Sequence, residues 1–150
     1  FWCQQLIAES LGKKGYGFFP VISKVPKDHH SLLQLYLDGP RDKLFYIFSS
    51  KEKSSPKINS KKFTNHLNYI NNKNLDQIKT AQKKALINSF RKKKIPYREF
   101  SINNFEEETM GELFSYFILE IIFVGKLSKI NPFDQPSVEQ VKKSTIKILN

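Results

Sequence analysis

Several residue types are scarce in this chain, and each shortage excludes a class of protein. A single cysteine, Cys3, leaves no intramolecular disulfide, which favours a reducing compartment and a cytoplasmic protein. No cysteine and histidine spacing suggests zinc, and no glycine-rich loop suggests a nucleotide cradle, so we predict neither a metal nor a cofactor. An N-terminal basic region followed by an apolar run, the mark of a signal peptide, is also missing.

Long hydrophobic runs are absent as well. The most apolar stretch, residues 113–124, contains Ser115 and Glu120 and is far shorter than the ~20 residues that span a bilayer. It therefore predicts a buried helix and no membrane partner. A length of 150 residues is enough for one domain with its own core. Because the chain does not begin with methionine, we expect it to be the C-terminal piece of a longer chain.

Positive charge is the feature present in excess, and it is confined to one segment. The formal net charge of +11 at first suggests a nucleic-acid partner. Residues 51–94 hold 13 basic and 2 acidic residues, whereas the remainder of the chain holds 12 of each. Few aromatic residues are interleaved with these charges, which argues against base stacking. We therefore predict no nucleic-acid partner, and an exposed basic loop region over residues 50–72.

The order of predicted elements indicates an α/β fold. Helical periodicity and capping residues predict helices over 2–12, from 29 or 30 to about 37, over 75–92, from near 105 to about 124, and over 136–149, with a partly helical piece over 63–70. Strands are predicted over 18–23, 43–49 and 97–102. Asp28, Asn104 and Asp134 are the expected N-caps. This alternation implies a single domain, 1–150, built as a three-layer sandwich with a mostly parallel sheet covered by helices.

The connector before the last helix carries polar groups at a helical spacing. It reads Asn131-Pro132-Phe133-Asp134-Gln135-Pro136-Ser137-Val138-Glu139-Gln140-Val141-Lys142. If the helix starts near Pro136, Gln135 and Lys142 are separated by two turns and face the same way. By itself, Lys142 fits a solvated helix lysine better than a functional one.

This connector resembles the C-terminal signature of phosphoglucose isomerase (glucose-6-phosphate isomerase), N-P-F-D-Q-x-x-V-E-x-G-K. Every specified position matches except one, where Val141 replaces the family's glycine and can alter how closely the backbone packs. Two further stretches follow in the family's order. Trp2-x-x-Gln5-x-x-x-Glu9-Ser10-x-Gly12-Lys13 resembles the segment of the essential glutamate, E-S-x-G-K, and His30-x-x-x-Gln34-Leu35 resembles the segment of the essential histidine.

The resemblance implies an aldose-ketose isomerase of glycolysis and gluconeogenesis that needs no cofactor. Glu9 would be the base that moves a proton between C2 and C1 of the open-chain sugar phosphate through a cis-enediol. His30 would assist ring opening, and Lys142 would lie near the ring oxygens or the developing charge. Gln5 and Gln135 would hold the substrate. The family's histidine reaches into the partner subunit's site, so a homodimer is implied.

Some alternatives stay open at this point. Either imidazole, that of His29 or that of His30, can titrate near neutrality, and the sequence leaves open which of the two faces the site. The family's Ser- and Thr-rich phosphate pocket and its essential arginine precede the segment matched here, so we expect this piece alone to be inactive. A catalytically inert sugar-phosphate-binding module of the same fold is the second hypothesis, and a nucleic-acid-binding domain that uses Lys51 to Lys94 is the third.

Overall fold

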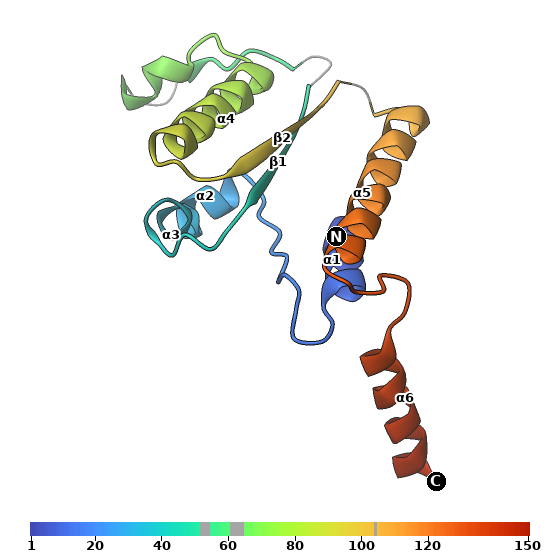
Figure 1. Cartoon of the computed structure of the whole chain (residues 1–150). Coiled ribbons are helices and arrows are strands. Elements are labelled where there is room, and N and C mark those ends of the chain that lie inside the picture. Colours follow the sequence, from blue (N-terminus) through green and yellow to red (C-terminus); the bar gives the residue numbers. More distant parts are fainter. Residues whose placement is uncertain (52–54, 61–64, 104) are drawn as a thin grey trace. The chain divides into compact units, whose positions relative to one another are not determined.

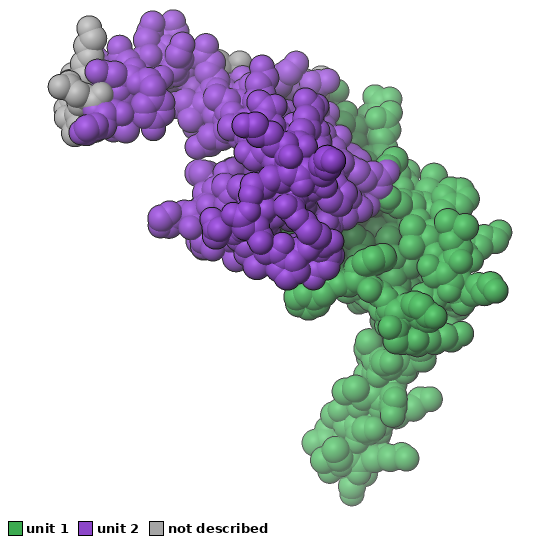
Figure 2. Space-filling model, turned by 60° about the vertical axis from the view of Figure 1, so that its left-hand side comes forward, with its two compact units in different colours: residues 1–23, 106–150 green, residues 24–105 purple. Residues whose placement is uncertain are grey.

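The computed structural model describes residues 1–51, 55–60, 65–103 and 105–150 (Figure 1). The chain divides into two compact units, drawn in green and purple in Figure 2. Unit 1 comprises Phe1–Ser23 and Glu106–Asn150, and unit 2 comprises Lys24–Phe105. That the 150 residues form a single C-terminal domain stays a prediction.

Unit 1 contains three helices: α1 (Trp2–Leu11), α5 (Glu107–Leu127) and α6 (Pro136–Leu149). All three were predicted, and α6 has the predicted bounds. α1 packs on α5, where the rings of Trp2 and Phe114 lie 4.6 Å apart. Leu11 of α1 is buried, as are Phe117, Ile121 and Gly125 of α5. These three residues of α5 are four apart, so the helix buries one stripe.

Residues 113–124 were predicted to form a buried helix; they are helical, but only one stripe of the helix is buried in the described structure. Outside the buried stripe, several large apolar side chains of α5 are exposed and others are half-buried, because α5 meets its neighbours in unit 1 along one side. Phe123 is 62% exposed and Leu127 is 84% exposed. None of the described helices is both long enough and apolar enough to cross a membrane.

Unit 2 holds the sheet. Its elements are α2 (Lys27–Ser31), α3 (Leu33–Asp38), β1 (Phe45–Ser50), a 3-10 helix η2 (Asn65–Ile70), α4 (Leu75–Lys92) and β2 (Tyr97–Ile102). β1 and β2 pair in parallel, with Phe45 opposite Tyr97. Phe90 of α4 is 1% exposed, and its ring lies 4.7 Å from that of Phe45 and 6.0 Å from that of Tyr97. The predicted α/β class with a parallel sheet is confirmed.

Local signals define both ends of α4. Asn74 and Gln77 form a capping box, since the Asn74 side chain accepts from the Gln77 N–H at 2.8 Å and the Gln77 side chain accepts from the Asn74 N–H at 3.0 Å. The last turn carries Arg91 and Lys92, where the helix dipole favours cations. The helix predicted over 75–92 is therefore confirmed at both ends.

Two predicted elements differ in the structure. Residues 18–23 form no strand: Pro20 has no N–H to donate, and its carbonyl oxygen accepts from Gln4 Nε2 at 2.8 Å instead. The single helix predicted to end near residue 37 is divided into α2 and α3 at Leu32. Asp28 does not act as an N-cap, because it lies inside α2 and its Oδ2 accepts from the Lys24 N–H at 2.6 Å.

The basic region is only partly described. Residues 52–54 and 61–64 of the predicted 50–72 loop, and the predicted cap Asn104, lie outside the described residues. Within the rest, Ser60 is fully buried, and the Ile58 and Asn72 backbones are joined by a hydrogen bond of 2.9 Å. The described part of the region is therefore not exposed throughout.

Candidate active site

α1 places an amide beside the carboxylate of Glu9. Gln5 and Glu9 are four residues apart and thus neighbours on one face of the helix. Gln5 Nε2 donates to Glu9 Oε1 at 3.3 Å, on an exposed part of α1. The helix ends at Gly12, where a Cβ would lie 2.6 Å from the carbonyl oxygen of Ala8. Glycine at this position therefore lets the chain leave the helix within one turn of Glu9.

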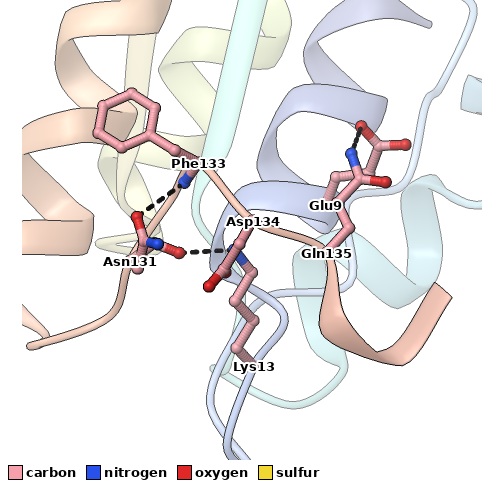
Figure 3. Close-up of polar contacts among 6 residues, drawn as sticks. All are labelled: Glu9, Lys13, Asn131, Phe133, Asp134 and Gln135. Atoms are coloured by element: carbon pink, nitrogen blue, oxygen red, sulfur yellow. Dashed lines mark hydrogen bonds and ion pairs between the residues drawn. The ribbon is translucent and has the colours of Figure 1, made fainter. Parts of the chain in front are cut away.

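A second amide reaches Glu9 from the far end of the sequence. Gln135 Nε2 donates to Glu9 Oε2 at 3.1 Å, across 126 positions of the chain (Figure 3). Each carboxylate oxygen thus accepts one amide N–H. An ionised carboxylate has about four acceptor positions, so both oxygens retain the capacity to take a proton. The two amides orient the carboxylate and leave it able to act as a base.

The loop that carries Gln135 is tied to the end of α1 by Lys13. Lys13 Nζ donates to the Asn131 carbonyl oxygen at 2.5 Å and to Asp134 Oδ1 at 2.9 Å (Figure 3). The Lys13 side chain is 9% exposed and that of Asp134 is 54% exposed. The hydrogen bond from Lys13 holds the pKa of Asp134 below its usual range.

The sequence predicted Asp134 as the N-cap of α6, and this prediction is wrong. Gln135 occupies that position and makes no side-chain cap bond, because its amide is directed to Glu9. The side chain of Asn131 stabilises the turn that precedes Asp134, since its Oδ1 accepts from the Phe133 N–H at 3.1 Å (Figure 3).

The same loop is anchored to α5 at its other end. Lys129 has a φ of 56°, and the Ile130 N–H donates to the Gly125 carbonyl oxygen at 2.8 Å. This is a Schellman motif, with a lysine where glycine is usual. A Cβ on Gly125 would lie 3.2 Å from the Ile130 carbonyl oxygen and 3.2 Å from Pro132 Cγ. The close approach of the loop to α5 therefore depends on this glycine.

Lys142 and Val141 lie on the exposed α6. Its start at Pro136 is as predicted, so Gln135 and Lys142 are two turns apart. The Lys142 ammonium forms an ion pair with Glu139 at 2.7 Å, and its side chain is 63% exposed. Val141, which replaces the family's glycine, is 66% exposed. The structure thus joins Gln135 to Glu9 and Lys142 to Glu139.

The two adjacent histidines of α2, in unit 2, differ in exposure. His30 is exposed, whereas His29 is half-buried. The Nε2 atom of His29 is buried and has no hydrogen-bond partner among the described residues. His30 is therefore the more exposed of the two imidazoles in the described structure.

An open hollow of about 390 Å³ lies beside the Gln5 amide. It is lined by Phe1, Gln4, Gln5, Ala8, Phe19 and Pro20. Within the described ranges, no group of three or more His, Cys, Asp or Glu side chains is placed to hold a metal ion.

The chain was compared with family models, curated proteins and solved structures. No family model matches the chain. A probable glucose-6-phosphate isomerase of Methanococcus maripaludis is 38% identical over 143 residues, which cover 95% of this chain and 32% of that protein. The chain is similar to a glucose-6-phosphate isomerase over almost all of its own length. A further relative of that name, from Mycoplasmopsis pulmonis, is 35% identical over 153 residues and covers 99% of this chain.

The similarity to these isomerases extends along nearly the whole chain. The chain spans about a third of the length of the curated relatives it matches. The crystal structure of a hypothetical protein from Thermus thermophilus matches with a TM-score of 0.88 at 29% identity, over 99% of this chain and 37% of that one. The resemblance deduced from the three motifs is confirmed, and so is the fold class.

Sequence reasoning missed one part of this candidate site. It included Lys13 in the E-S-x-G-K motif but assigned it no role, and it assigned Asp134 to a helix cap. The available signal was the motif itself, in which a lysine follows directly after the glycine that ends the helix.

Proposed function

We propose that this chain is the C-terminal part of a glucose-6-phosphate isomerase and carries its catalytic base. The observation that supports this is the carboxylate of Glu9, held on each oxygen by an amide, from Gln5 and from Gln135. It occurs in a chain whose relatives bear that name at 29–38% identity. We propose a cytoplasmic enzyme of glycolysis and gluconeogenesis that interconverts glucose 6-phosphate and fructose 6-phosphate.

The proposed reaction is a proton transfer between two neighbouring carbons. Glu9 removes the proton from C2 of open-chain glucose 6-phosphate, the electron pair forms the C1–C2 double bond, and O1 takes a proton to give the cis-enediol. Glu9 then returns its proton to C1 while O2 loses its proton and becomes the ketone oxygen. No atoms are gained or lost, so one carboxylate can act first as base and then as acid.

Other residues supply binding and ring opening in this proposal. Gln5 and Gln135 hold substrate hydroxyls as well as the base. Lys142 turns from Glu139 toward the developing negative charge, which a long exposed side chain can do. His30 assists ring opening in the site of the partner subunit of a homodimer, and its exposure is consistent with that role.

The proposal includes a limit on the isolated piece. A phosphate dianion needs a cluster of donors such as hydroxyls, backbone N–H groups or an arginine. We assign no such cluster in this chain, so we propose that the 150 residues alone do not turn over sugar phosphates.

The experiment is a coupled assay of fructose 6-phosphate conversion by the complete polypeptide that contains these residues. Glu9→Gln keeps the shape of the side chain but removes the base, so activity should fall by several orders of magnitude. Glu112→Gln, which makes the same change at an exposed position of α5, is the matched control and should leave activity unchanged.

Two results would contradict the proposal. Equal activity of Glu9→Gln and the unchanged protein would mean that another group moves the proton. Absence of turnover by a folded protein that still binds fructose 6-phosphate would favour the inert sugar-phosphate-binding module.

A further inference from the structure

Lys13 occupies a rigid position directly after α1. Its backbone N–H donates to the carbonyl oxygens of Leu11 at 2.9 Å and Tyr16 at 3.1 Å, and its own carbonyl accepts from the Tyr16 N–H at 2.9 Å. Lys14 and Gly15 have φ values of 52° and 77°. These values are those of a type I′ turn, which closes the chain back on Lys13. The backbone from which the lysine side chain extends is therefore fixed on both sides.

The side chain of Lys13 is committed to the loop 131–135. Its ammonium is on a stem that is nine-tenths buried and donates to the Asn131 carbonyl and the Asp134 carboxylate. A buried ammonium that loses its partners retains its desolvation cost, so this geometry resists rearrangement. Exposed lysine pairs, such as that of Lys142, have no comparable constraint.

The two acceptors of Lys13 bracket the loop just before the residue that reaches the base. Asn131 lies at its start, and Asp134 immediately precedes Gln135. Gln135 in turn donates to Glu9, which is four residues before Lys13. Two hydrogen bonds thus join the end of α1 to the loop: one from Lys13 to Asp134, and one from Gln135 to Glu9 (Figure 3).

We propose that Lys13 is a positioning residue of the active site: by tying Asn131 and Asp134 to the end of α1, it places the Gln135 amide on the Glu9 carboxylate. Lys13 makes no contact with the base and acts through Gln135. The consequence for catalysis rests on the proposed function, whereas the placement of Gln135 does not.

A double-mutant cycle in the complete polypeptide tests the catalytic consequence. Lys13→Met keeps the apolar stem and removes both bonds, so kcat should fall roughly tenfold to hundredfold, the cost of misplacing an active-site group by about 1 Å. Adding Lys13→Met to Gln135→Ala should cost little more, because both act through one amide. Lys13→Arg should recover part of the loss. Lys14→Met, at the adjacent exposed lysine, is the matched control.

A second measurement does not depend on activity. In protein labelled with ¹⁵N at glutamine side chains, the Gln135 amide resonance should respond to protonation of Glu9. That response should vanish in Lys13→Met and persist in Lys14→Met. If Lys13→Met does not fold, Asp134→Ala removes one of the two acceptors at an exposed side chain and should weaken the response.

The outcomes separate the two proposals. If the protein without substitutions has no isomerase activity, the proposed function is wrong. The Gln135 amide resonance then still tests the positioning role of Lys13. Additive losses in the double mutant, or a Gln135 amide that responds to pH equally with and without Lys13, would overturn the positioning role.

Discussion

At the scale of single residues, the pair of Lys13 and Asp134 gives the candidate site one contact that depends on pH. The Lys13 hydrogen bond lowers the pKa of Asp134, so the tie is complete above the ordinary aspartate range of about 3.9 and is lost as the pH falls through the lowered pKa. Lys13→Met should therefore raise the pKa of Asp134, as followed by NMR of its carboxyl carbon. An unchanged titration would show that Lys13 does not hold this carboxylate.

Residue-level roles were predictable from the sequence only where they are local. The four-residue spacing of Gln5 and Glu9 indicates a shared helix face, and the structure shows the hydrogen bond. The tie between Lys13 and Asp134 joins positions 121 apart, and no periodicity encodes such a contact. Local reasoning therefore gave Asp134 the role its residue type most often has before a helix.

At the scale of elements, the end of α5 sets where the loop to Gln135 begins. Gly111 and Gly125 lie in the same helix, and an added Cβ meets nothing within 4 Å at Gly111 but meets Ile130 and Pro132 at 3.2–3.3 Å at Gly125. Gly111→Ala should stabilise by about 0.5–1 kcal/mol, because alanine has the higher helix propensity. Gly125→Ala should instead lower the thermal midpoint, since the Ile130 carbonyl oxygen and the Pro132 ring would have to shift to admit the added methyl group.

Gly111→Ala is the matched control for this comparison, because it makes the same change at an open position. Equal gains at both glycines would mean that the loop moves freely away from α5. The structure predicts opposite signs in thermal unfolding of the two variants.

Two helices with strong local signals were predicted to the residue, whereas one of the three predicted strands was wrong. α4 has a capping box and a clear apolar face, and α6 starts at a proline, so their bounds were correct. The aromatic residues 18–23 suit a strand, but a strand also needs a neighbour, and Phe19 is instead 91% exposed. Helix propensity alone likewise does not predict that the helix is divided into α2 and α3 at Leu32.

At the scale of the whole molecule, the proposed homodimer makes a specific prediction about mixed subunits. If His30 acts in the partner's site, a dimer of one Glu9→Gln and one His30→Ala subunit has one site with both defects and one intact site. Random mixing of the two inactive proteins should then restore about a quarter of the unchanged activity. No recovery in verified mixed dimers would place His30 and Glu9 in the site of the same chain.

The fold class was predictable, because helices alternating with strands favour a parallel sheet. The burial of α5 was not, since the sequence shows that a helix is apolar but not which of its sides is covered. The excess of positive charge was also informative only through its distribution. Because it is confined to residues 51–94, the net charge alone did not indicate a nucleic-acid partner.

The most direct test of the central claim, that Glu9 moves a proton between two carbons, is to follow deuterium during isomerisation. The complete polypeptide would convert fructose 6-phosphate in deuterated water, and NMR would locate the label. We predict deuterium at C2 of glucose 6-phosphate, because a proton held by a carboxylate exchanges with solvent, and loss of both turnover and exchange in Glu9→Gln. A product that carries no deuterium at C2 even after prolonged equilibration between the two sugar phosphates would indicate a direct hydride shift, and exchange that persists in Glu9→Gln would show that Glu9 is not the base.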